Sequence, residues 1–208
     1  MSDGVCELRM KVLIACEFSG IVRDAFKNRG HDAWSCDLLP TESEGNHIIG
    51  DVLKHLDDGW DLMIAHPPCT HLAVSGGRWF KDKQKEQIEA IDFFMALINA
   101  QIPKICVENP ISVMSTKYRK PNQTIQPWQF GHTEYKATCL WLKGLTKLIP
   151  TCIVENKAIY KRWVTSKEEK IHHNVHLGFG FPWSSKECKQ ARSRTFEGIA
   201  EAMSKQWG

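Results

Sequence analysis

The sequence predicts an α/β protein built on a doubly wound, mostly parallel sheet. Apolar runs of strand length alternate along the chain with segments of helical periodicity, a pattern typical of folds in which helices connect parallel strands. Polar, glycine or proline residues follow each run and mark the strand ends. Because such sheets bind ligands at the carboxyl ends of their strands, we expect a ligand site at that edge.

The first predicted unit is a strand, a tight turn and a helix. Residues 11–16 form a short apolar run, and residues 18–20 read Phe-Ser-Gly. Residues 21–29 have a helical pattern that Gly30 closes. This unit places a glycine turn at the carboxyl end of the first strand.

Later elements follow the same two patterns. Short apolar runs predict further strands at 32–36, 60–65, 104–107 and 138–142. Apolar residues at helical spacing predict helices at 84–99 and 195–207. The segment 143–190 is less regular and is expected to be rich in loops.

Composition sets the broad class of protein. The 208 residues fit a single domain, 1–208, and carry a formal net charge of +3. This charge permits a phosphate-bearing partner without requiring one. The eight cysteines include no C-x-x-C pair, so we expect free thiols. Neither a signal peptide nor an apolar run near the ~20 residues of a membrane span occurs, and we therefore expect a soluble, cytoplasmic protein without membrane contact.

The first turn and the acids after it suggest a nucleotide-like ligand. The turn of Phe18, Ser19 and Gly20 lets the backbone approach such a ligand, and Asp37 ends the next strand, where a carboxylate suits ribose hydroxyls. Asp51 is a second acid that could accept from an adenine amino group. Turns of this kind also occur in purely structural αβ units, and that alternative stays open.

A second motif presents a thiol. His66, Pro67 and Pro68 precede Cys69 directly after a predicted buried strand. The two prolines fix φ and remove backbone donors, so the thiol stands on a stiff loop. Such a thiol can attack C6 of a pyrimidine and make C5 electron-rich enough to accept an electrophile.

This chemistry needs a carboxyl group near N3 of the ring. Glu108 follows the strand 104–107 and precedes Asn109 and Pro110. Its carboxyl group could stabilise charge on the ring and pair with an exocyclic amine. Either motif alone could be a structural loop, but together, at the ends of two strands, they favour a catalytic site.

The two motifs, in this order, resemble those of the DNA cytosine-5 methyltransferase family, over residues 11–142 and the last helix. The resemblance implies a Rossmann-like sheet of the class I S-adenosylmethionine-dependent type, S-adenosylmethionine as cofactor, and a cytosine flipped out of DNA. Catalysis would fall to Cys69 and Glu108. The cofactor-binding residues implied are Phe18, Ser19, Gly20, Asp37, Asp51 and Pro67.

A basic segment of the family helps to hold the target base. Residues 130–138 are similar to it, with Lys136 as a base-pocket cation that lacks the planar fork of arginine. Gln190 to Arg194 matches its Gln-x-Arg-x-Arg spelling but lies beside the terminal helix, so we favour Lys136 as the third catalytic residue. The remaining substrate-binding candidates are Pro68, Asn109, Thr138, Arg192 and Arg194.

The sequence also departs from the family. Val22 stands where the cofactor turn usually has a second glycine, and only 143–190 stands in place of a target-recognition domain. Two rival functions therefore remain open: C5 modification of a free pyrimidine nucleotide or unusual base, and non-catalytic nucleic-acid binding. A transferred group larger than methyl and the oligomeric state are also open.

Histidines offer two further hypotheses. His66 and His71 flank Cys69 and could adjust its pKa, carry the C5 proton, or act only as hydrogen-bond partners. His172, His173 and His176 with Cys188 lack the spacing of a zinc finger, so we expect no metal.

Overall fold

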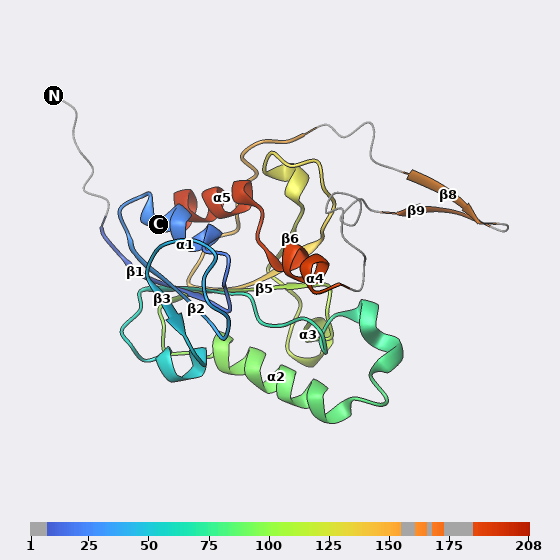
Figure 1. The fold of residues 1–208 in the computed structure, drawn as a ribbon, viewed down its shortest axis with the longest axis horizontal. Coiled ribbons are helices and arrows are strands. Elements are labelled where there is room, and N and C mark those ends of the chain that lie inside the picture. Colours follow the sequence, from blue (N-terminus) through green and yellow to red (C-terminus); the bar gives the residue numbers. More distant parts are fainter. Residues whose placement is uncertain (1–7, 155–160, 166–167, 173–184) are drawn as a thin grey trace.

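A seven-stranded sheet forms the centre of the protein (Figure 1). The computed structural model describes residues 8–154, 161–165, 168–172 and 185–208. The strand order is β3-β2-β1-β4-β5-β7-β6. The strands are β1 (Lys11–Ala15), β2 (Asp32–Asp37), β3 (His47–Ile49), β4 (Leu62–Ala65), β5 (Lys104–Pro110), β6 (Gln123–Ile125) and β7 (Thr138–Lys143).

The direction of the strands confirms the predicted fold class. The strands β3, β2, β1, β4 and β5 pair in parallel, whereas β7 is antiparallel to β5 and β6 is antiparallel to β7. The sheet is thus Rossmann-like, doubly wound and mostly parallel.

Helices cover both faces of the sheet (Figure 1). On one face lie α1 (Ile21–Lys27) and α5 (Glu197–Trp207), and on the other lie α2 (Gln84–Ile98) and α3 (Met114–Lys117). The remaining helices are α4 (Lys186–Ser193) and the 3-10 helices η1 (Val52–His55), η2 (Val74–Trp79) and η3 (Pro127–Gln129). None of the helices in the described residues is long and apolar enough to cross a membrane.

Alternate side chains of β1 pack into two separate hydrophobic clusters. Val12 and Ile14 pack in a cluster with side chains of α1 and α5, whereas Leu13 packs in a cluster with side chains of α2. All three side chains are fully buried. Burial on both faces explains why the sequence shows an uninterrupted apolar run here rather than an alternating one.

Several elements differ from the sequence prediction. The strand β5 does not end at Val107 but continues to Pro110, because β7 pairs with it across this extension. The three-residue strands β3 and β6 are too short for a periodicity to predict. The segment expected to be rich in loops contains the first part of α4 and a hairpin of β8 (Lys161–Thr165) and β9 (Glu168–His172).

The topology creates a natural ligand site between β1 and β4. These two strands are neighbours, yet the chain leaves β1 through α1 on one face and β4 towards α2 on the other. Their carboxyl ends therefore diverge, which opens a crevice at the point where the strand order reverses.

Candidate active site

A cavity of about 680 Å³ lies at this crevice. It is walled by the residues that follow β1 and β4, by the end of β5, and by the segment before α5. The structure thus brings together most of the predicted site residues. Those that line the cavity are Phe18, Ser19, Asp37, Pro67, Pro68, Cys69, Glu108, Asn109, Lys136 and Arg192.

The loop that carries Cys69 is fixed to its neighbours by hydrogen bonds. The amide of His66 donates to the Ala15 carbonyl over 2.9 Å, and Asn109 Nδ2 donates to the Pro67 carbonyl over 3.0 Å. Pro67 is buried, whereas Cys69 is exposed. The predicted stiff loop with an accessible thiol is therefore present, and Asn109 holds it from β5.

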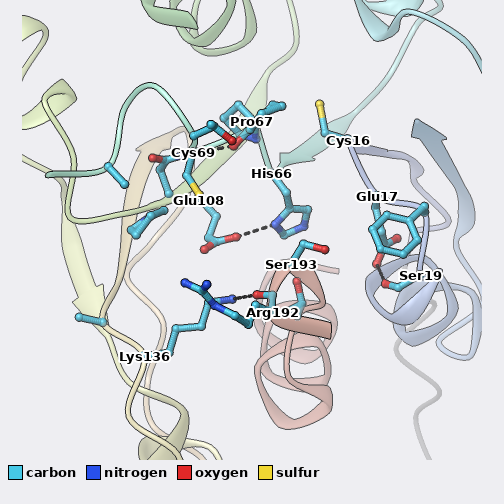
Figure 2. Close-up of a pocket in the computed structure, with 18 of the residues that line it drawn as sticks. Cys16, Glu17, Ser19, His66, Pro67, Cys69, Glu108, Lys136, Arg192 and Ser193 are labelled. Carbon is cyan, nitrogen blue, oxygen red and sulfur yellow. Dashed lines mark hydrogen bonds and ion pairs between the residues drawn. The ribbon is translucent and has the colours of Figure 1, made fainter. Parts of the chain in front are cut away.

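Glu108 and His66 point toward each other in the cavity (Figure 2). His66 Nδ1 and Glu108 Oε2 are 2.8 Å apart, and the two side chains are only 8% and 16% exposed. Burial raises the pKa of the Glu108 carboxyl group, but the hydrogen bond and charge of His66, together with Lys136, outweigh it and lower the pKa overall. Glu108 is therefore a carboxylate in the ligand-free site.

Opposing charges act on the Cys69 thiol. Desolvation by the cavity wall and the Glu108 carboxylate raise its pKa, whereas Lys136 and Arg192 lower it. The raising effects are larger, so the thiol keeps its proton until a ligand changes its surroundings. Cys16 also lines the cavity, but burial, Asp37 and other acidic neighbours raise the pKa of its thiol much further.

The two candidate basic segments meet in the structure. Lys136 Nζ donates to the backbone carbonyl of Arg192 over 2.9 Å (Figure 2), although the residues are 56 positions apart. Lys136 also lies 5.9 Å above the ring of Phe196. Both cationic residues line the cavity, and Lys136 lies close enough to Glu108 to lower its pKa, so both segments contribute to this site.

A buried acid, Glu17, organises the turn after β1. The preceding residue, Cys16, has a backbone φ of +59°, which is uncommon for a residue other than glycine. Glu17 is 4% exposed and accepts from the amides of Val22 and Arg23 and from Ser19 Oγ, at 2.7, 3.2 and 3.2 Å. Burial nevertheless raises the pKa of its carboxyl group.

Two predicted cofactor residues do not line the cavity. Gly20 has a φ of +78°, and a Cβ there would collide with Ser43 and Arg23, so its glycine serves the packing of the turn. Asp51 is exposed and caps η1 by accepting from the Leu53 amide. Asp37, in contrast, lies on the cavity wall.

Two predicted substrate residues also lie elsewhere. Thr138 is buried in β7 and donates to the Lys136 carbonyl. Arg194 makes two hydrogen bonds to Glu42, at 2.9 and 2.7 Å, and does not line this cavity. Its guanidinium is engaged by a carboxylate rather than directed at a ligand.

Sequence reasoning gave too little weight to Glu17 and His66. Glu17 directly follows the apolar run 11–16, as Glu108 follows the run 104–107, and this shared position could have identified it. His71 does not line the cavity, and its carbonyl accepts from Gln87. The described residues contain no group of three or more side chains suited to a metal ion, and His173 and His176 lie outside them.

No family model and no curated protein matches the sequence. Among solved structures, the chain is similar to a candidate DNA modification methyltransferase encoded within an E. coli prophage, with 14% sequence identity and a TM-score of 0.46. The match covers 77% of this chain and 59% of that chain, so this chain spans less than two thirds of that protein's length.

Proposed function

We propose that this protein is an S-adenosylmethionine-dependent methyltransferase that modifies C5 of cytosine in DNA through a covalent bond between Cys69 and C6. One observation carries the proposal: Cys69, after β4, and Glu108, near the end of the neighbouring parallel strand β5, line a single cavity at the switch point of the sheet. That pair is what C6 attack and N3 stabilisation require.

The other wall of the cavity fits the cofactor. Phe18 and Ser19 line it beside β1, and Asp37 contributes a carboxylate that can accept from two ribose hydroxyls. The Glu17 carboxylate already accepts from the amides at the start of α1, so this helix start suits a ligand without phosphate. S-adenosylmethionine, when bound, supplies an electrophilic methyl group on a sulfonium centre.

The residues around the nucleophile divide the remaining chemistry. The Cys69 thiolate forms a bond to C6, and the electrons of the C5–C6 double bond move towards C5 and N3. The proton that the Cys69 thiol gives up as this bond forms passes to the Glu108 carboxylate, which donates it to N3 and so stabilises this charge. After methylation of C5, the C5–H bond breaks, the double bond re-forms, and Cys69 leaves as a thiolate.

A polynucleotide substrate is supported by the charge on the cavity wall. Lys136 and Arg192 both line it, and cationic side chains there suit the phosphates that flank a flipped base. We assign target recognition to the segment 143–190, of which 155–160, 166–167 and 173–184 lie outside the described residues. The hairpin of β8 and β9 belongs to this segment, and Figure 1 shows it away from the seven-stranded sheet.

The test is transfer of a labelled methyl group from S-adenosylmethionine to duplex DNA, single-stranded DNA and dCMP. Mass spectrometry of the digested product identifies the methylated position. We expect 5-methylcytosine from DNA, and a covalent adduct when the DNA contains 5-fluorocytosine, because fluorine cannot leave as the C5 proton does.

Matched variants define the controls. Cys69→Ala should form no adduct, whereas Cys152→Ala, which removes an exposed thiol outside this cavity, should form it normally. Methyl groups on N4 of cytosine or N6 of adenine would contradict the C5 chemistry. Labelling of dCMP alone would contradict the DNA substrate.

A further inference from the structure

His66 has one engaged and one unengaged ring nitrogen. Nδ1 lies 2.8 Å from Glu108 Oε2, whereas Nε2 is buried and has no hydrogen-bond partner in the described part of the chain. The imidazole lines the cavity, between Glu108 and the turn that carries Glu17 (Figure 2). A buried polar atom without a partner is costly, so such an atom in a ligand cavity indicates that a bound molecule meets it.

The Glu108 contact fixes the tautomer of this ring. Because Glu108 offers Oε2 as an acceptor, Nδ1 carries a proton and donates it. When the ring is neutral, its lone pair is therefore on Nε2, the unengaged nitrogen. A carboxyl group that orients a histidine in this way also stabilises the imidazolium that forms when Nε2 accepts a proton.

The proposed reaction leaves one role unassigned, namely the base that takes the proton from C5. Glu17 is 4% exposed and its oxygens already accept from backbone amides, and Lys136 is a cation whose Nζ donates to a carbonyl. Arg192 is a permanent cation without a lone pair. Asp37 lies at the end of β2, on the cofactor side, and Glu108 is directed at N3.

We propose that His66 is a further catalytic residue, whose Nε2 accepts the C5 proton of the methylated intermediate. This inference rests on the proposed function. The C5–H bond breaks, its electrons form the C5–C6 double bond, and the C6–S bond breaks to return Cys69 as a thiolate. The proton ends on Nε2 and passes to solvent when the product leaves, so the step needs no further reactant.

The variant His66→Asn separates the two nitrogens. Its amide nitrogen approximates Nδ1 and can still donate to Glu108, but nothing replaces Nε2. In a single turnover on DNA, we expect methyl transfer to change less than tenfold while release of tritium from 5-tritiated cytosine slows about 100-fold. The methylated covalent adduct should accumulate, and deuterium at C5 should slow product formation in the variant.

The early steps provide the internal control. Trapping by 5-fluorocytosine does not involve loss of a C5 proton, so wild type and His66→Asn should trap equally well. If methyl transfer and tritium release slow together without an isotope effect, His66 only positions Glu108 and the inference fails. If wild type forms no adduct at all, the proposed function itself fails, which is a different result.

Folding of the variant is checked by its thermal midpoint. If His66→Asn does not fold, His66→Gln serves instead, because its amide lies near the position of Nε2 yet cannot accept the C5 proton. Fast tritium release in a folded His66→Gln protein would overturn the inference, and accumulation of the methylated adduct would support it.

Discussion

The two walls of the cavity are built on opposite principles. On the β1 side, the Glu17 carboxylate lies inside the turn and accepts three hydrogen bonds, and the pKa of the Cys16 thiol is raised far from reactivity. On the β4 side, His66, Cys69 and Glu108 face the cavity with charges that act on one another. In the proposed function, the first wall provides the shape of the cofactor pocket, and the second provides the reactive groups.

The difference teaches how one sheet edge can serve both tasks. A saturated turn holds its conformation without a ligand, which suits a cofactor pocket that must be formed in advance. In the proposed function, a buried group with an unengaged atom, such as His66 Nε2, would gain its partner from the substrate. Substitutions on the β4 side should therefore change rates, whereas those on the β1 side should change affinity or stability.

The largest effect is expected from Cys69→Ala. Loss of the nucleophile should lower kcat for methyl transfer by about 10⁴-fold or more, because no other cysteine of the described residues lines this wall. Cofactor affinity, measured by isothermal titration calorimetry, should stay within twofold of wild type. A Cys69→Ala protein that lost cofactor binding as well would contradict the separation of the two walls.

Affinity should respond on the β1 side, where two acids form a matched pair. Asp37 and Asp51 each accept from a backbone amide two residues ahead, but only Asp37 lines the cavity. Asp37→Asn should weaken cofactor binding by about tenfold or more, since charge-assisted hydrogen bonds contribute about 1.5–3 kcal/mol. Asp51→Asn should leave the dissociation constant of the cofactor nearly unchanged. An equal loss of affinity in both variants would contradict the different roles of the two acids.

These two acids also show what sequence can predict. Their positions in the sequence place both near the ligand-binding edge of the sheet. The sequence does not show the direction of either side chain, and that of Asp51 caps η1. The Pro-Pro-Cys loop was predictable because its stiffness is local. The hydrogen bond between His66 and Glu108 was not, because it joins side chains 42 positions apart across two strands.

The same reasoning applies to the basic segments. Each was visible as a short pattern, yet their meeting through Lys136 Nζ and the Arg192 carbonyl depends on where α4 packs after an irregular segment. The fold class itself was predictable because burial on both faces leaves a continuous apolar run in each central strand. The short strands β3 and β6 form by pairing with β2 and β7, and their own sequences carry no such signal.

A moderate effect on stability is expected from Glu17→Gln. Because burial raises the pKa of this carboxyl group in the folded protein, its ordinary value of 4.5 marks the lower end of the sensitive range. Below it, Glu17 is protonated in both states. As pH rises through the raised pKa, the unfolded chain releases the proton more readily, and the folded state loses stability.

The measurement is the difference in unfolding free energy between wild type and Glu17→Gln as a function of pH. The unfolding free energy of wild type should fall relative to that of Glu17→Gln as pH rises above 4.5. Glu86→Gln provides the control, because Glu86 likewise lies near the start of a helix, in the first turn of α2, but is exposed. A flat difference for Glu17, or an equal slope for Glu86, would show that the carboxylate in the turn is not strained by burial.

The smallest effect is expected where the two walls are joined. Arg194 follows α4 and pairs with Glu42, whose amide donates to the Phe18 carbonyl over 2.8 Å. Both side chains are more than a third exposed, at 41% and 37%. A double-mutant cycle of Glu42→Gln and Arg194→Gln should therefore give a coupling free energy of only about 0.2–1 kcal/mol, reduced by salt.

The cycle becomes informative when it is repeated with cofactor bound. If the walls act independently, the coupling between Glu42 and Arg194 should be the same with and without cofactor. A coupling that grows on binding would mean that the ion pair transmits the occupancy of the β1 wall to the segment that carries Arg192. In that case shape and reactivity would be linked through this pair, and substitutions on the β1 side would change kcat as well as affinity.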